Sequence, residues 1–82
     1  MSTIWLDWVD KLDLHGGGHT ELTTVTDRKA GRTIDTEEVA RKFLSQIQPR
    51  LSKTHPDYVW SIEEFFETRP FPYFAIRGER RR

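Results

Sequence analysis

Tyr58–Ile76, with the sequence YVWSIEEFFETRPFPYFAI, is the stretch on which we expect the fold to depend. It contains seven of the ten aromatic residues in the chain: Tyr58, Trp60, Phe65, Phe66, Phe71, Tyr73 and Phe74. Aromatic side chains bury more apolar surface than other residues do. The centre of the core is therefore predicted to lie here.

This stretch divides into two predicted strands. Tyr58–Glu63 alternates between strongly apolar and more polar positions, which predicts a strand with one apolar face. A short helix over 61–67 is the alternative, because Ser61 and Glu64 have capping-box spacing. Pro70 ends either element, and Phe71–Arg77 resumes as a strand with Phe74 and Ile76 on one side. A hairpin over about 58–77 results.

The preceding segment predicts the helix, over about 36–48. Asp35 or Thr36 can cap its N-terminus, and Glu38 follows Asp35 at capping-box spacing. The apolar residues form a single stripe along it: Val39, Ala40, Phe43, Leu44 and Ile47. Pro49 disfavours helical geometry at the residue before it, so the regular helix is expected to end near Ile47.

The N-terminal segment Thr3–Leu14 has apolar spacing that fits either a helix or a strand. Its β-branched and aromatic composition favours the strand. The glycines at 16–18 then form a hairpin loop, and Thr20–Asp27 returns with Leu12 opposite Leu22 and Val9 opposite Val25. After a short connection at 28–31, Arg32–Ile34 is predicted to resume an extended strand.

The fold class predicted from these elements is α+β. Residues 1–78 form a single small domain, in which one helix covers one face of an antiparallel sheet built from a hairpin or meander and a second hairpin. Residues 79–82 are expected to be a charged flexible tail. The other face of the sheet is expected to be partly solvated.

Composition excludes several classes of protein. The chain has no cysteine, so disulfides, thiolate nucleophiles and sulfur-ligated zinc are excluded. The N-terminus lacks the basic and apolar regions of a signal peptide, and no apolar run approaches the roughly 20 residues that cross a bilayer. We therefore expect a cytoplasmic protein without a membrane contact.

Charge alternates in blocks along the chain although the net charge is zero. The net charge is −4 over residues 1–27, +4 over 28–53, −4 over 54–68 and +4 over 69–82. Adjacent blocks can neutralise one another after folding, or they can leave a bipolar surface that attracts a charged partner.

No catalytic or cofactor-binding constellation emerges. A zinc site built from His15, His19 and His55 is chemically conceivable, but the glycines between the first two fix no ligand geometry. The HGGG string at 15–18 is found in esterase oxyanion loops, yet the chain lacks the G-x-S-x-G elbow of that class. We predict no enzyme activity, metal or cofactor.

By elimination, the predicted function is protein binding. Small accessory or inhibitor-type proteins of this size, including those encoded by phages and other mobile elements, dock on larger complexes. Aromatic and arginine side chains dominate such interfaces. The predicted contact residues lie off the core face of the sheet: Trp5, Arg69, Phe71, Tyr73 and Arg77. The partner is an unidentified protein, with a homodimer as a further alternative.

Nucleic-acid binding is the alternative function. The stretch at 69–76, RPFPYFAI, resembles the aromatic strand motif of RNA-recognition domains, whose rings stack on bases. It departs from that motif at Pro70, Pro72 and Ile76, and the helix and strand that should follow are missing. The residues assigned to this alternative are Arg69, Tyr73, Arg77, Arg80, Arg81 and Arg82.

Overall fold

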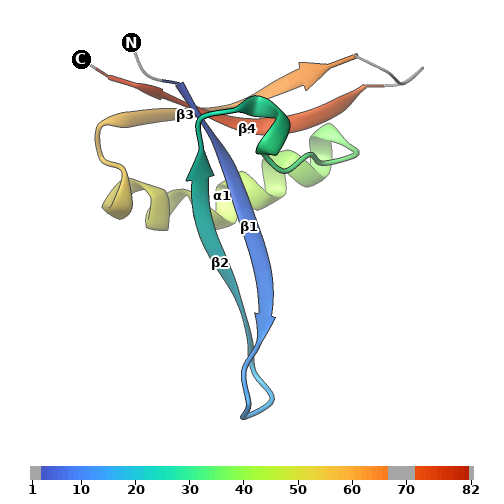
Figure 1. Ribbon diagram of the computed structural model, residues 1–82, viewed down its shortest axis with the longest axis vertical. Helices are drawn as coiled ribbons and strands as arrows, with labels where there is room; N and C mark the ends of the chain where they lie inside the picture. The colour runs from blue at the N-terminus through green and yellow to red at the C-terminus, as the bar shows by residue number, and fades with distance from the viewer. Residues whose placement is uncertain (1–2, 67–71, 82) are drawn as a thin grey trace.

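The computed structural model describes residues 3–66 and 72–81, which form a four-stranded antiparallel sheet with a helix on one face (Figure 1). The strands are β1 (Thr3–Leu12), β2 (Gly18–Val25), β3 (Tyr58–Phe65) and β4 (Tyr73–Arg80). A short 3-10 turn, η1 (Arg28–Ala30), and the helix α1 (Glu37–Thr54) lie between β2 and β3. The predicted α+β class is confirmed.

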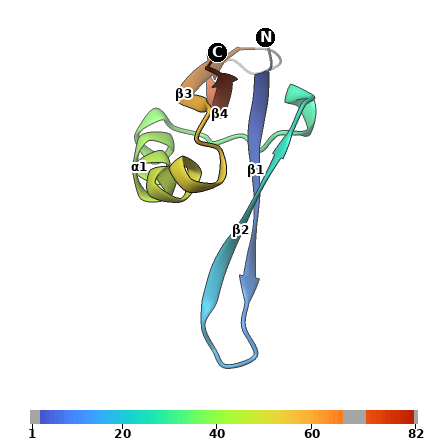
Figure 2. The same cartoon turned by 90° about the vertical axis from the view of Figure 1, so that its left-hand side faces the viewer.

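The sheet has the order β2-β1-β4-β3, so the N-terminal strand lies inside it. β1 pairs with β4 only over Thr3–Trp5, whereas it pairs with β2 over Trp5–Leu12. The outer part of the β1–β2 hairpin, residues 9–21, therefore leaves the sheet. We call it the arm, and it is visible in both views (Figures 1 and 2). The strand interpretation of the N-terminal segment is confirmed.

The predicted register of this hairpin is wrong by four positions. Leu22 lies opposite Trp8, not Leu12, and Val25 lies opposite Trp5, not Val9. The reason is that the turn is tight and starts earlier than the glycine run suggests. The Asp13 amide donates to the Gly17 carbonyl at 2.6 Å, and Gly16 adopts a left-handed φ of 87°. Gly18 is already part of β2.

The core lies between the sheet and α1. Its buried members from the strands are Ile4, Leu6, Trp60, Phe74 and Ile76, joined by Ala40, Ile47 and Leu51 of the helix and by Ile34. Trp60, Phe74 and Ile76 were predicted there, and Ile62 packs against them. Val39 was predicted in the helix stripe but is 54% exposed.

α1 continues past its predicted end near Ile47 and contains Pro49 in its interior. Ile47 and Leu51 are one turn apart and both are buried, so packing holds the C-terminal part of the helix in place. Pro49 and Ser45 lie on the exposed side, where the Ser45 carbonyl that proline leaves without a donor can bond water. Thr36 is the N-cap, and its hydroxyl accepts from the Val39 amide at 3.3 Å.

Three further predictions are corrected. Arg32–Ile34 is not a strand; Ile34 forms an isolated bridge with Phe74. β3 is extended through Phe65, so the helical alternative over 61–65 is wrong, while residue 67 lies outside the described residues. Glu79 and Arg80 belong to β4, where Glu79 pairs with Thr3, so they are not a flexible tail.

Candidate functional site

The aromatic contact surface predicted from the sequence is not exposed where the structure describes it. Trp5 and Tyr73 do lie off the helix-covered face, but they are only 8% and 9% exposed. Both pack against Phe65, with ring centroids 5.7 Å apart in each pair. Arg69 and Phe71 lie outside the described residues.

Phe65 and Trp5 are in turn covered by η1 and the glycine after it. The guanidinium carbon of Arg28 lies 3.8 Å from the centroid of the Phe65 ring. Gly31 approaches Trp5 so closely that a Cβ at position 31 would lie 3.0 Å from the Trp5 Cβ. The second face of the sheet therefore carries a small core of its own, which is why its aromatics are buried.

The predicted cationic residues are partly neutralised by the sheet. Arg77 of β4 forms ion pairs with Glu63 of β3 at 3.6 Å and with Glu79 at 3.5 Å, and its side chain is 33% exposed. Arg80 and Arg81 are exposed, and Arg82 lies outside the described residues. With Tyr73 buried, the predicted nucleic-acid set retains no exposed ring at a described position.

Neither a metal-binding cluster nor a membrane-spanning helix is found within residues 3–66 and 72–81. This part of the chain contains no cluster of three or more histidine, aspartate or glutamate residues able to hold a metal ion. Within the same residues, no helix has the length and apolar character to cross a bilayer.

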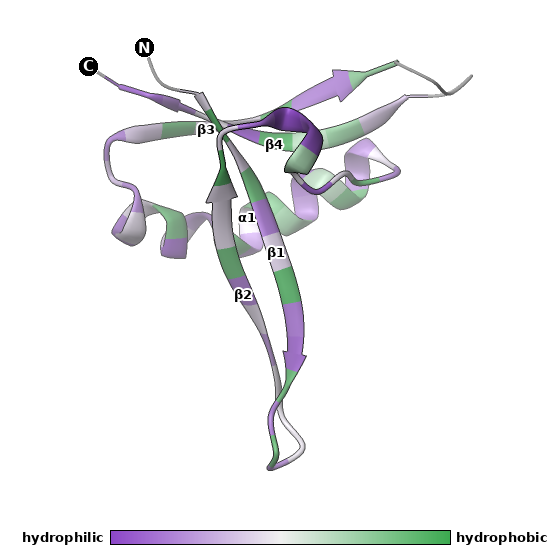
Figure 3. Cartoon of the chain, in the orientation of Figure 1, coloured by the Kyte–Doolittle hydropathy of each residue, from purple (hydrophilic) through white to green (hydrophobic). Residues whose placement is uncertain are grey.

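Three of the six exposed large apolar side chains among the described residues lie together on the arm. The other three lie on α1 and on or just after β3: Val39, Val59 and Phe66. Trp8 still packs on the helix, where its ring centroid lies 4.5 Å from that of Phe43. Beyond it, Val9 is 52% exposed, Leu12 89% and Leu14 101%. Figure 3 shows apolar segments recurring along the arm as far as its tip. Leu12 and Leu14 lie just before the glycine run at 16–18, so two apolar residues beside a predicted turn were the sequence signal for an apolar hairpin tip.

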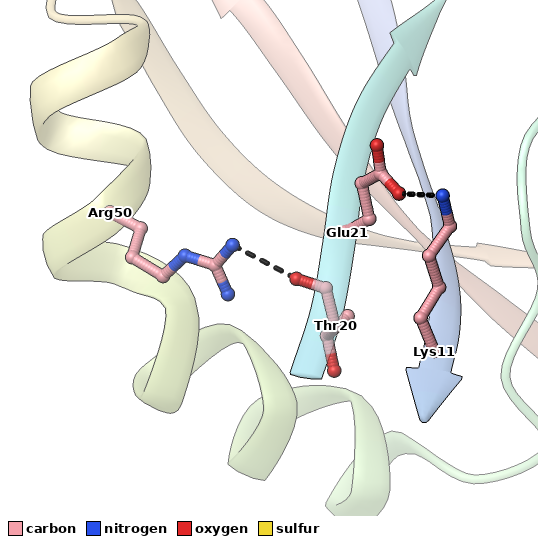
Figure 4. Close-up of polar contacts among 4 residues, drawn as sticks. All are labelled: Lys11, Thr20, Glu21 and Arg50. Atoms are coloured by element: carbon pink, nitrogen blue, oxygen red, sulfur yellow. Dashed lines mark hydrogen bonds and ion pairs between the residues drawn. The ribbon is translucent and has the colours of Figure 1, made fainter. Parts of the chain in front are cut away.

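Polar side-chain contacts join the two strands of the arm. Lys11 and Glu21 form an ion pair across the two strands at 2.5 Å (Figure 4). The Thr20 hydroxyl donates to Asp10 at 3.0 Å. The hydrogen bond from the Lys11 ammonium holds the pKa of the Glu21 carboxyl below its ordinary value of 4.5.

The outer side of β2 is a free edge of the sheet. The Asp13 amide bonds the Gly17 carbonyl, so Asp13 and Gly17 are a hydrogen-bonded pair, and every second pair along the hairpin is of the same kind. Thr20, Leu22 and Thr24 belong to the pairs in between, so their main-chain N–H and C=O groups point away from β1. An independent contact agrees, since Arg50 of α1 donates to the Thr20 carbonyl at 2.9 Å. Figure 4 shows Arg50 reaching Thr20 from the side of β2 opposite β1.

A groove runs along this edge, between β2 and the C-terminal half of α1. It has a volume of about 170 Å³. Its lining comes from both elements: Leu6, Leu22, Thr23 and Thr24 from the strands, and Arg50, Leu51, Thr54 and His55 from the helix and its C-cap. The free strand edge and an apolar groove thus lie side by side.

Comparison of the chain with protein-family models, with curated proteins and with solved structures finds no match in any of the three.

Proposed function

We propose that this protein is a non-enzymatic protein-binding module that docks on a larger protein complex. The observation that carries the proposal is the projecting arm, on which Val9, Leu12 and Leu14 are exposed. An isolated two-stranded hairpin is at best marginally stable in water. Apolar side chains at its tip have no core to enter, and burial against a partner would stabilise both the side chains and the hairpin.

The proposal includes an accessory or inhibitor-type role in the cytoplasm. The absence of cysteine supports a reducing compartment. The proposed contact is the arm rather than the predicted set of Trp5 and the residues at 69–77, because Trp5 and Tyr73 are buried. Arg69 and Phe71 stay predictions, as they lie outside the described residues.

Nucleic-acid binding stays the second candidate and is less well supported. Its aromatic residue Tyr73 is buried, and Arg77 is paired with two carboxylates. A nucleic-acid binder would shift the mobility of DNA or RNA at low salt and lose that shift steeply as salt rises. We expect no such shift at any salt concentration.

The arm is tested by capture of the partner from source cells with the tagged chain and a Leu12→Ser, Leu14→Ser double variant. Val59→Ser is the matched control, because Val59 is a 48% exposed aliphatic residue on the opposite edge strand. We expect the double variant to lose the captured protein and the control to retain it. A photo-crosslinker at position 12 should join the same protein.

Equal recovery by all three proteins would show that the arm is not the contact. An unchanged melting temperature of the double variant is the necessary control for folding, and it is expected because both leucines are almost fully exposed.

A further inference from the structure

We infer that the partner contributes an extended peptide segment, which adds an antiparallel strand to the free edge of β2 and places a carboxylate against Arg50. The inference rests on the proposed function and names the mode of binding and the chemistry of the partner. It concerns the groove between β2 and α1, which is separate from the leucines of the arm.

The edge of β2 is chemically ready for another strand. In the described part of the chain, the outward main-chain groups of Leu22 and Thr24 have no hydrogen-bond partner, while the Thr20 carbonyl is held by Arg50. Natural edges are protected by charged side chains, by proline, by a bulge or by a covering element. At Leu22 and Thr24, β2 has no proline and no bulge, because its sequence is GHTELTTV and its pairing with β1 is continuous over eight positions; its one acidic residue, Glu21, is paired with Lys11.

The corresponding main-chain carbonyls on the outer side of β1 do have hydrogen-bond donors. On β1, the Trp8 carbonyl accepts from the Arg32 guanidinium at 2.6 Å and the Leu6 carbonyl from the Arg32 amide at 3.4 Å. Leu22 and Thr24 are therefore distinguished from their neighbours on β1 by their open main-chain groups, and they are the residues that line the groove.

The groove suits one apolar side chain of an added strand. Leu6, Leu22 and Leu51 form its apolar lining, and its volume of about 170 Å³ is close to the roughly 150 Å³ of a cavity known to accept benzene. Residues paired directly opposite Leu22 or Thr24 would point to the same face of the sheet as Leu22, which is the face covered by α1. An aliphatic residue at either position enters the groove.

Arg50 supplies the charge preference. Its guanidinium donates to a neutral carbonyl in the free protein, and a carboxylate is a stronger acceptor for it. The residue opposite Thr20 lies two positions after the residue opposite Leu22, because the added strand runs antiparallel to β2. The expected segment therefore has an aliphatic residue, any residue and then a carboxylate. No acidic side chain lines the groove, and the Asp10 carboxylate beside Thr20 accepts a hydrogen bond from the Thr20 hydroxyl.

A second copy of this chain fits less well than a partner protein. The side chains of β2 on the helix-covered face at the positions in question are Thr20, Leu22 and Thr24, so a paired β2 would bring no carboxylate to Arg50. Glu21 points to the opposite face and is paired with Lys11.

The first test uses a labelled peptide, Ser-Val-Thr-Val-Thr-Glu-Ser with an amidated C-terminus, and fluorescence anisotropy with the full chain. The peptide with glutamine in place of glutamate tests the carboxylate, and the peptide ending at Val-Thr-Val with a free terminus tests a main-chain carboxylate as the source. We expect the glutamine peptide to bind about tenfold more weakly. Binding by the shortened free-acid peptide alone would assign the chain terminus as the ligand.

Two changes test strand addition itself. Thr24→Pro removes an outward N–H without removing a bond to β1, so the protein should fold and lose binding. Methylation of alternate peptide nitrogens removes the peptide's donors and leaves the protein untouched. On addition of the unmodified peptide, the Leu22 and Thr24 amides should become protected from hydrogen exchange.

Arg50→Gln should abolish the preference for glutamate over glutamine while retaining residual binding. The inference is overturned if no peptide of the set binds, if methylated and unmodified peptides bind equally, or if the protected amides lie outside β2. A concentration-dependent dimer with protected Leu22 and Thr24 amides would assign the edge to a second copy and would also overturn it.

The same variants distinguish a failure of this inference from a failure of the proposed function. If Leu12→Ser, Leu14→Ser loses the captured partner but Thr24→Pro and Arg50→Gln retain it, protein binding through the arm stands and strand addition at β2 is wrong. If all variants retain the partner, neither the arm nor the β2 edge is the contact, and the captured protein binds another surface of the chain.

Discussion

At the scale of single residues, Gly78 shows how closely the core is packed. Gly78 lies on β4 between Ile4 and Trp60, its partners on the two neighbouring strands. The Trp60 ring lies directly over it, and a Cβ at position 78 would come within 2.7 Å of the Trp60 Cζ3 atom. The glycine is needed here for close approach of a side chain, because its backbone does not have a positive φ.

Gly78→Ala is therefore expected to lower the free energy of unfolding by about 1–3 kcal/mol, the usual cost of overpacking a core. The rigid and buried indole of Trp60 has little room to move away. Gly17→Ala is the matched control, since the nearest atom to its Cβ would be 4.0 Å away, and its effect should stay within about 0.5 kcal/mol. Urea unfolding of both variants measures the difference. Equal stability of the two would show that Trp60 does not hold this position.

The sequence patterns predicted which face of the sheet a side chain points to better than they predicted whether that side chain is buried. The alternation at 73–77 correctly separated Phe74 and Ile76 from Tyr73, and Trp60 was correctly placed under the helix. It could not show that Trp5 is covered, because Gly31 packs on Trp5 and Arg28 packs on the neighbouring Phe65 ring, and a local pattern identifies 28–31 only as a connection. Contacts between residues so distant in sequence leave no periodic signal.

At the scale of elements, α1 shows tertiary packing prevailing over a local rule. Its capping region and apolar stripe were visible in the sequence, but its last turns were not, because Pro49 normally ends a helix. Burial of Leu51, which is 1% exposed, stabilises the segment after the proline. The hairpin register failed for a similar reason, since three consecutive glycines permit several turns and only Gly16 adopts the left-handed conformation.

Pro49→Ala should consequently stabilise the protein. Alanine restores an amide donor for the Ser45 carbonyl and removes the clash of the proline ring, so we expect the free energy of unfolding to rise by about 1–3 kcal/mol. Pro49 is exposed, and the change leaves no cavity. Thermal and urea unfolding measure the gain. Leu51→Ala is the informative contrast: it should destabilise by about 2–5 kcal/mol, because it removes a buried side chain. A loss of stability in Pro49→Ala would contradict a continuous helix through this position.

At the scale of the whole molecule, antiparallel pairing brings the charge blocks of the sequence together. The acidic 54–68 block and the basic 69–82 block meet as β3 and β4, where Glu63 bonds Arg77. Within the acidic N-terminal block, the basic residue Lys11 pairs with Glu21 across the hairpin. The sequence pattern thus reflects strand pairing at these sites. The charge pattern at these sites therefore does not mark a binding surface, and the distinctive feature of the molecule is its division into a packed body and a projecting arm.

That division predicts that the body folds without the outer arm. Val9 and Glu21 form a hydrogen-bonded pair, which a two-residue Asn-Gly turn can close after residues 10–20 are removed. The deletion removes the exposed Leu12 and Leu14, the exposed ion pair of Lys11 with Glu21, and the exposed hydrogen bond from Arg50 to the Thr20 carbonyl, and exposed polar contacts contribute little to stability. We expect a single unfolding transition and a free energy of unfolding within about 1 kcal/mol of the full chain. The shortened protein should also lose the partner that the arm captures. A collapse of the β3–β4 amide pattern in its NMR spectrum would instead show that the arm is part of the core, and the leucines at its tip would then need an explanation other than a partner.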